Sequence, residues 1–426
     1  MKRQIIYLLF FIPVFTACLE SPVMTTGIVN GKEKPTVLTY STDPDIDNGS
    51  LLFQGEITSI GKSDIIEKGF YWSSVSKDLN KKDTIIVPNT GADIFTYELK
   101  GASGDTTYYW QAFAKNMYGE DYGEVQSCRT PPIWVERTPL NAFARGQGAI
   151  FLINNKIYIT CGVLLLGAGK TPTDEAWVYD IDLYQWQQIT SFTGDKRIYP
   201  VVFIIGNLAF VGTGLNDSAT ACNDFYAFNS TAPEGGWTHI DTPDDFEARY
   251  KAVAFSLNGY GYVVGGYNNK NGKFSDVWRF NGNNNLWNRI SDFPVPIYGG
   301  ISVSNSTRAF VGFGENEESS RTLWEYSDKD DKWSEFAKLP QDVVEKISSG
   351  VIVQNTIYIV DYDNQIWTLD LSDKTWTKKA QLPIELLLDG QVETGHTLLT
   401  SGTSNSIYVG LGFSKLLYEY RPLWDN

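Results

Sequence analysis

Short runs of apolar residues recur at a nearly constant interval along the C-terminal two thirds of the chain. Each run begins with an aromatic residue, and in five cases of six a glycine stands four residues after that aromatic. The β-branched and aromatic composition predicts a short strand that ends in a tight turn. The aromatic residues stand 48 to 52 residues apart, at Tyr158, Phe210, Tyr262, Phe310, Tyr358 and Tyr408.

Two further patterns keep the same register. One is an alternating strand pattern, as in Trp177–Asp180 and Trp278–Asn281, and the other is a tryptophan nine or eleven residues after its start. A repeat of about fifty residues with four short strands predicts a β-propeller, because one such sheet buries its faces only against neighbouring copies. The tryptophans, which open the predicted outermost strands, are Trp186, Trp237, Trp287, Trp333 and Trp376.

The sixth repeat lacks its outermost strand, because its tryptophan would stand one position past Asn426. Residues Ile133–Arg137 have the composition of an outermost strand, and Trp134 lies 52 residues before Trp186. Closing a ring of sheets removes exposed strand edges. We therefore predict that residues 132–139 close the last sheet, with Trp424 as a second candidate for that role.

These repeats resemble the kelch family, whose motif has a double glycine after the second strand, Tyr-Asp in the third strand and Trp in the fourth. Tyr262–Gly266 carries the full double glycine, and the other repeats carry part of it. The resemblance covers residues 132–426. It implies an all-β, six-bladed kelch-type β-propeller of the galactose oxidase-like kind.

The N-terminal segment predicts export. Lys2 and Arg3 precede an apolar run that is too short to span a membrane, so residues 1–17 are predicted to be a signal peptide. Small residues before Cys18 resemble the bacterial lipoprotein lipobox, which implies acylation of Cys18; ordinary secretory cleavage is the alternative. Residues 18–36 then form a tether. We expect a cell-envelope protein, held at the outer membrane through the lipid alone.

Residues 37–131 show short alternating runs with turn signals, which predict a small β-sandwich. The stretch Thr106–Asn116 resembles the end of fibronectin type III or Ig-like modules that are common in exported proteins of the Bacteroidetes. The whole chain is thus similar to kelch lipoproteins of that group. Pro131 and Pro132 mark the joint between the sandwich and the propeller.

The net charge of the chain excludes one class of partner. The formal net charge is −15, which argues against nucleic acid as a partner because phosphate backbones need a basic surface.

Three cysteines follow Cys18, namely Cys128, Cys161 and Cys222. Cys161 and Cys222 belong to adjacent repeats and either pair or remain buried thiols.

The sequence gives no sign of a metal or a cofactor. Galactose oxidase, a kelch copper enzyme, needs two histidines and two tyrosines at one site, whereas here the only histidines are His239 and His396, predicted on different strands of different repeats. Acidic and amide-rich tracts such as Asp328–Asp331 fall where hairpin loops are expected. We expect neither a metal nor a cofactor.

One polar pattern keeps register with the repeats. Thirteen residues before the landmark aromatics stand Arg145, Arg197 and Arg249, at the predicted entrance to the innermost strands. Arginine forks suit carboxylates, so the three could form an arc at the channel mouth; alternatively, they bond carbonyl groups between blades. The neighbours that would join such a site are Tyr250, Tyr298, Glu393 and His396.

Two functions follow from this. In the first, a lipid-anchored binding protein uses its propeller to bind a glycan or a protein. In the second, the chain is a metal-independent sugar-acid enzyme, since bacterial sialic acid mutarotases are six-bladed kelch propellers. Under that resemblance, the arginine arc would hold the carboxylate and Glu393 or His396 would move the proton.

Overall fold

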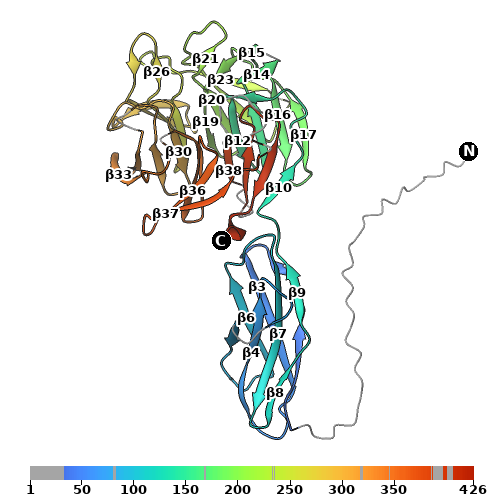
Figure 1. Ribbon diagram of the computed structural model, residues 1–426. Coiled ribbons are helices and arrows are strands. Elements are labelled where there is room, and N and C mark those ends of the chain that lie inside the picture. The colour runs from blue at the N-terminus through green and yellow to red at the C-terminus, as the bar shows by residue number, and fades with distance from the viewer. Residues whose placement is uncertain are drawn as a thin grey trace, which may run out of the picture.

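The computed structural model describes residues 33–79, 83–166, 169–232, 234, 236–316, 320–344, 346–384, 386, 397–400 and 406–426. The described chain consists mostly of strands, which form an elongated sandwich and a wider propeller (Figure 1). Among the described residues, no helix has both the length and the apolar character that crossing a membrane requires.

The N-terminal module packs two antiparallel sheets face to face. Phe53 of one sheet stacks on Trp110 of the other, with ring centroids 4.9 Å apart, at the centre of the shared core. The first sheet contains β1 (Thr36–Tyr40), β2 (Pro44–Asp45), β3 (Ser50–Ser59) and β6 (Ile94–Lys100). The second contains β4 (Ile65–Ser73), β5 (Thr84–Ile86), β7 (Thr107–Asn116), β8 (Gly119–Tyr122) and β9 (Gln126–Arg129).

The propeller contains six four-stranded antiparallel sheets in the described part of the chain, here called blades 1 to 6. Blade 1 contains β12 (Ala149–Ile153), β13 (Lys156–Thr160), β16 (Ala176–Asp180) and β17 (Gln185–Ile189), and blade 2 contains β19 (Val201–Ile205), β20 (Leu208–Gly212), β22 (Phe225–Asn229) and β23 (Trp237–Ile240). Blade 3 contains β24 (Val253–Leu257), β25 (Tyr260–Val264), β28 (Val277–Asn281) and β29 (Leu286–Ile290), and blade 4 contains β30 (Ile301–Ser304), β31 (Ala309–Gly312), β32 (Thr322–Ser327) and β33 (Lys332–Lys338). Blade 5 contains β34 (Ile347–Val353), β35 (Thr356–Asp361), β36 (Gln365–Asp370) and β37 (Trp376–Gln381), and blade 6 contains β38 (Thr397–Thr400), β39 (Ile407–Gly410), β40 (Leu417–Tyr420) and β10 (Trp134–Arg137). Short strands in the connecting loops are β11 (Arg145–Gly146), β14 (Val163–Leu166), β15 (Gly169–Pro172), β18 (Arg197–Ile198), β21 (Leu215–Asn216), β26 (Tyr267–Asn268) and β27 (Gly272–Lys273).

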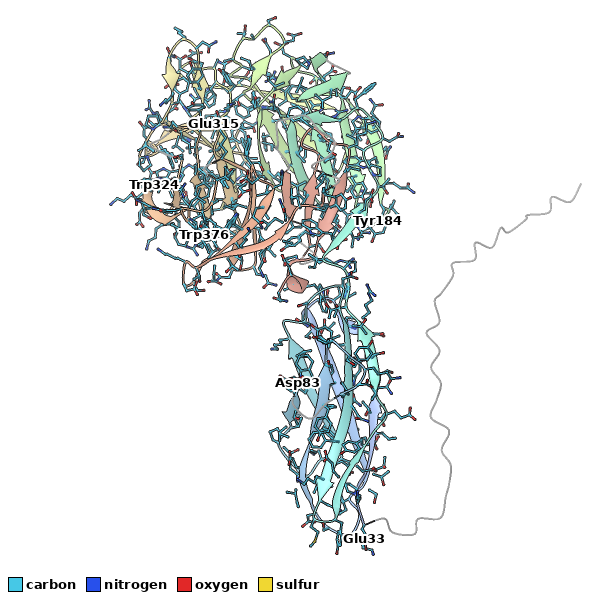
Figure 2. The ribbon with its side chains drawn as sticks, viewed as in Figure 1. Glu33, Asp83, Tyr184, Glu315, Trp324 and Trp376 are labelled. Atoms are coloured by element: carbon cyan, nitrogen blue, oxygen red, sulfur yellow. The ribbon has the colours of Figure 1, made fainter. Side chains whose placement is uncertain are left out.

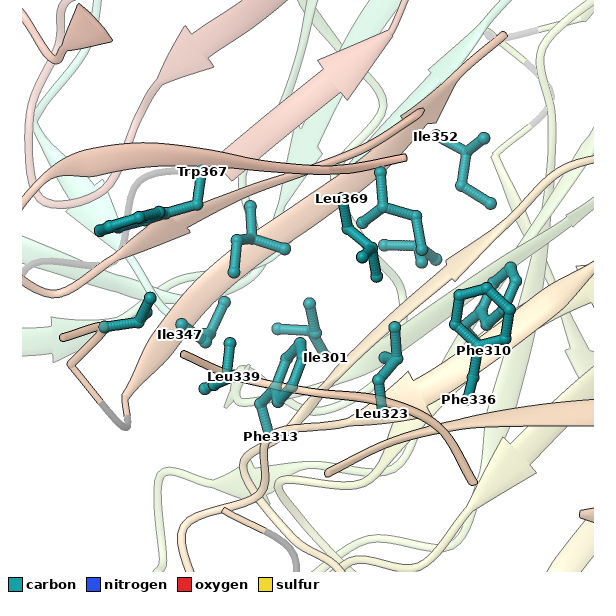
Figure 3. Close-up of a cluster of buried hydrophobic side chains, with 14 of the residues drawn as sticks. Ile301, Phe310, Phe313, Leu323, Phe336, Leu339, Ile347, Ile352, Trp367 and Leu369 are labelled. Carbon is teal, nitrogen blue, oxygen red and sulfur yellow. The ribbon is translucent and has the colours of Figure 1, made fainter. Parts of the chain in front are cut away.

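The landmark aromatics of the repeats form the contacts between blades. Tyr158 of blade 1 packs against Phe228 of blade 2, with ring centroids 5.4 Å apart. Phe210 meets Phe280 of blade 3 at 4.9 Å in the same way. Figure 3 shows the equivalent cluster between blades 4 and 5, where Phe310 belongs to the same buried core as residues of β36. The repeat period therefore marks the spacing of these shared cores.

Blade 6 joins the two ends of the propeller. Strand β10 pairs antiparallel with β40, opposing Trp134 to Tyr420, at the place where the sequence predicts a closing strand. The rings of these two residues lie 4.7 Å apart. A buried cluster that contains Tyr408 of blade 6 and Tyr179 of blade 1 completes the ring of interfaces.

The C-terminal turn enters the sandwich. Trp424, in the short 3-10 helix η2 (Pro422–Trp424), is buried in the same core as Phe53 and Trp110. Its carbonyl accepts a hydrogen bond of 2.7 Å from the backbone amide of Gly104. The expectation that Trp424 could complete the last blade is therefore wrong, because its indole fills the sandwich core and β10 takes the outermost place.

The cysteines of adjacent blades remain reduced. Cys161 and Cys222 are free and buried, so the disulfide alternative does not hold in this structure. Burial raises the pKa of the Cys161 thiol to about 12 and that of the Cys222 thiol to about 11. Both residues therefore act as small packing groups.

Candidate functional site

The three register arginines are fully buried. Arg197 donates from Nη1 to Asp224 Oδ1 at 2.6 Å and from Nη2 to Asp224 Oδ2 at 3.0 Å. Arg249 makes the same fork with Asp276, at 2.6 and 2.8 Å. Arg145 donates from Nη2 to Glu175 Oε2 at 2.7 Å. Internal carboxylates therefore hold the guanidinium groups that the sequence offered to an anionic ligand.

The same positions connect the blades through their backbone. The carbonyl of Arg197 accepts a hydrogen bond of 2.8 Å from the amide of Gly162 in blade 1, and that of Arg249 accepts one from Gly214 in blade 2. Gly214 has a φ of 101°, and a Cβ there would lie 2.8 Å from the carbonyl oxygen of Ile198, so the position needs glycine. The guanidinium groups of Arg197 and Arg249 also donate to the carbonyls of Thr213 and Gly265. These bonds resemble the alternative interpretation, in which the arginines bond carbonyl groups, but they lie within a blade and not between blades.

Four turn residues lie two positions after the register of the arginines, which Ile297 occupies in the fourth blade. Gln147, Tyr199, Lys251 and Gly299 have φ values of 60°, 55°, 54° and 64°, in four consecutive blades. The amide of Tyr199 donates to the Gln147 carbonyl at 2.8 Å, and that of Gly299 donates to the Lys251 carbonyl at the same distance. A left-handed conformation costs a residue other than glycine about 1 to 3 kcal/mol, and such strain gathers at functional sites.

These turn residues line a cavity of about 440 Å³, here called the mouth cavity. Its size falls within the range of about 300 to 1,000 Å³ that is typical of small-molecule sites. The other residues that line it come from blades 1 to 6 and include Ile150, Pro200, Ala252, Gly300, Glu315, Lys346, Ser348, Tyr362, Leu411 and Phe413.

Charged groups meet in the mouth cavity. Lys251 Nζ donates to Glu315 Oε1 and Oε2 at 2.7 and 2.8 Å and lies 5.0 Å from the centre of the Tyr199 ring. Figure 2 marks Glu315 in the upper part of the propeller. The exposed Lys346 amine lies 5.8 Å from the centre of the Tyr362 ring, and no ion pair joins it to another described residue. One ammonium group is therefore available to an anionic ligand.

Of the other residues singled out from the sequence, two lie near the mouth cavity and three lie outside the described residues. Tyr250 and Tyr298 lie next to the mouth cavity without lining it. The ring centroid of Tyr250 lies 6.4 Å from that of Tyr199, a cavity residue. The Tyr298 ring contacts the Tyr267 ring, which in turn contacts Tyr250. Burial raises the pKa of the Tyr250 hydroxyl. Glu393, His396 and Cys18 lie outside the described residues.

Three residues of the cavity were missed from the sequence. Lys251 stands two positions after Arg249, in a register that includes Gln147 and Tyr199. The sequence does not single out Lys251, because the residue type at this position changes from blade to blade. Glu315 and Lys346 also keep register, since Glu315 follows Phe310 by five residues as Tyr267 follows Tyr262, and Lys346 precedes Tyr358 by twelve as Tyr250 precedes Tyr262. Their residue types change from blade to blade, so the repeat does not single them out. Among the described residues, no three metal-ligating side chains gather in one place.

Comparison with known proteins agrees with this architecture. Residues 146–360 match the family model described as the KLHDC2/KLHL20/DRC7 kelch-repeats domain. The chain belongs to the kelch-repeat family. This kelch protein is 30% identical over 137 residues to N-acetylneuraminate epimerase of Pasteurella multocida (strain Pm70), a match that covers 30% of the chain and 34% of the relative.

It is also 23% identical over 181 residues to an F-box/kelch-repeat protein of Arabidopsis thaliana, covering 42% of the chain and 49% of that protein. The chain thus matches between a third and a half of the length of these relatives. A solved structure titled "Structure of YjhT" superimposes with a TM-score of 0.51 at 15% identity, covering 64% of this chain and 91% of that one. At this identity, the likeness supports the fold alone.

Proposed function

We propose that this kelch protein binds a carboxylate-bearing sugar in the mouth cavity. The observation that carries the proposal is that Lys346 and the Lys251–Glu315 ion pair line the same cavity, which is built from equivalent turns of adjacent blades. The sugar class is suggested by the relative named N-acetylneuraminate epimerase. Of the two ligand types that the sequence left open, a glycan fits this small polar cavity better than a protein.

Each part of such a sugar has a suitable group in the cavity. The Lys346 ammonium would bind the carboxylate, since charge-assisted hydrogen bonds are the stronger ones. Glu315, held in place by Lys251, would accept hydrogen bonds from sugar hydroxyls. The Tyr199 and Tyr362 rings line the same cavity and would pack against the apolar face of the sugar ring.

A calorimetric titration tests this proposal. We expect wild type to bind N-acetylneuraminate at least tenfold more tightly than N-acetylmannosamine, which lacks the carboxylate. Lys346→Met should weaken N-acetylneuraminate binding about tenfold, equivalent to about 1.4 kcal/mol. Lys329→Met removes an exposed lysine from another loop and should change nothing. Equal binding of the two sugars by wild type would contradict the proposal.

A second candidate function is catalysis on the same sugar. It is favoured by the match to the epimerase and by Glu315, a carboxylate in the cavity that could transfer a proton. Positioned acid–base groups contribute about 10² to 10⁴-fold to rates. We expect Glu315→Gln to abolish any acceleration of anomer exchange in N-acetylneuraminate while retaining binding within a few-fold. If wild type does not accelerate the exchange measured by NMR, this candidate fails and the binding proposal remains.

We also propose that the protein is exported and anchored through lipid on Cys18. The lipobox-like residues before Cys18 support this. Cys18→Ser should prevent labelling by a radioactive fatty acid and release the protein from the membrane fraction. Equal labelling of wild type and variant would contradict the anchor.

A further inference from the structure

A second hollow lies at the junction between the sandwich and the propeller. This junction groove has a volume of about 340 Å³ and none of its lining residues belongs to the mouth cavity. Its floor is one face of blade 5, with Thr356, Tyr358, Thr368 and Asp370. The sandwich contributes the loops around Gly49 and Gly101, and η2 closes one end.

Blade 5 has a short, uncharged side chain at a position where two other blades have long charged ones. The position of Thr356 is occupied by Lys156 in blade 1 and by Arg308 in blade 4. Both of these pair with a carboxylate on the neighbouring strand: Lys156 with Asp180 and Arg308 with Glu325. Thr356 is too short to fill the same space, and it carries no charge that could neutralise a carboxylate.

At this position of blade 5, one carboxylate oxygen has no hydrogen-bond partner among the described residues. Thr356 opposes Asp370 in the strand register, just as Lys156 opposes Asp180. Asp370 Oδ1 accepts the amide of Ser372 at 2.7 Å, but no described residue hydrogen-bonds Asp370 Oδ2. The Tyr358 hydroxyl in the same groove also makes no hydrogen bond within the described part of the chain.

The chemistry of the groove selects its ligand. A carboxylate oxygen accepts hydrogen bonds, whereas hydroxyl groups both donate and accept them. The charges of Asp370 and Lys379, which both line the groove, oppose each other, so a ligand without net charge is favoured; the Lys379 amine also donates to the Asp425 carbonyl. A divalent cation needs several oxygen ligands, yet no three acidic or metal-ligating residues gather among the described residues.

We propose that the junction groove is a second ligand site, which takes a neutral, hydroxyl-rich molecule of monosaccharide size. Adjacent hydroxyls of the sugar donate to Asp370 Oδ2, and the threonine and tyrosine hydroxyls bond the remaining oxygens. The site is formed jointly by both domains, so it exists only while the sandwich is seated on the propeller. It does not depend on the acidic sugar proposed for the mouth cavity.

The test uses saturation-transfer NMR on the full mature chain with glucose, galactose, mannose and N-acetylglucosamine. We expect at least one of these neutral sugars to bind wild type. Thr356→Lys introduces the side chain that blade 1 has at this position. The new lysine should pair with Asp370, fill the groove and weaken binding of that sugar at least tenfold. The melting temperature should stay the same or rise.

Two further variants make the result decisive. Asp370→Asn keeps the volume and removes the charge, so it should weaken the sugar about tenfold, and it replaces Thr356→Lys if that variant does not fold. Lys346→Met alters the mouth cavity alone and should leave the neutral sugar bound as in wild type. The proposal is overturned if none of the four sugars binds wild type, if Thr356→Lys binds equally well, or if Lys346→Met removes the signal.

Discussion

Arg197 and Arg249 act on the scaffold through two different groups. The guanidinium of each is tied to an aspartate of its own blade, and its carbonyl accepts an amide from the blade before. The register identified these positions from the sequence, but not their burial. A usable signal was present, because the aspartate stands 27 residues after the arginine in both cases.

Removing one of these guanidinium groups should destabilise the protein. Arg197→Gln removes a fully buried guanidinium and leaves the half-buried Asp224 without its charge partner, which should cost about 1 to 3 kcal/mol. Urea denaturation measures this loss. The control is Arg289→Gln, because Arg289 forms an exposed pair with Asp292 and should contribute less than about 1 kcal/mol. A loss below 1 kcal/mol at Arg197 would refute the scaffold role.

The same pair predicts a pH dependence. Burial alone would raise the pKa of the Asp224 carboxyl, but the hydrogen bonds and charge of Arg197 outweigh it and hold the pKa below its ordinary value. The stabilisation is therefore complete above the unfolded-state pKa of about 3.9 and is lost as the pH falls through the lower folded-state pKa. The unfolded-state pKa is the same in both proteins, so the free-energy gap between wild type and Arg197→Gln should be largest near pH 7 and should narrow as the pH falls toward 3. A gap that stays constant down to pH 3 would contradict this assignment.

The packing of the blades is the part of the structure that the sequence predicted best. The aromatic landmarks recur because each packs against the third strand of the next blade, as Tyr158 does on Phe228, so the period is a direct consequence of packing. The position of Trp134 opposite Tyr420 follows from the same periodicity. By contrast, the mouth cavity depends on loop residues such as Glu315 and Lys346, whose places keep register but whose residue types differ from blade to blade.

Two truncations compare the closing strand with the sandwich. Deleting residues 19–131 keeps β10, whereas deleting residues 19–139 removes it and exposes the edge of β40. Burying a tryptophan-bearing strand is worth several kcal/mol at about 25 cal/mol per Å², a large share of a domain's stability. The longer deletion should therefore melt at a clearly lower temperature in calorimetry. Equal melting temperatures would show that β10 does not close the ring.

The two domains are held together at both ends of the propeller. The chain passes from the sandwich into β10, and after β40 it returns to the sandwich through Trp424. Asp425 also accepts the amide of Ala380 in blade 5 at 2.6 Å. From the sequence, we predicted a joint between the two domains at Pro131 and Pro132. The sequence showed no sign of the second contact, because one tryptophan after the last strand has no pattern to compare it with.

Trp424→Ala should loosen the sandwich more than the propeller. Removing a buried tryptophan leaves a cavity and typically costs about 3 to 5 kcal/mol. Hydrogen exchange should become faster in β3 and β7, whose residues surround the indole, while β25 keeps its protection. Leu286→Ala, which truncates a side chain that is 58% exposed, serves as the control. Unchanged exchange in the sandwich would mean that the tail is not part of its core.

The most direct test of the account is a crystal structure of the mature protein soaked with N-acetylneuraminate. We predict the sugar in the mouth cavity, with its carboxylate within hydrogen-bonding distance of Lys346 Nζ and at least one hydroxyl on Glu315. A sugar bound elsewhere, or an empty mouth cavity at saturating concentration, would contradict the proposed function.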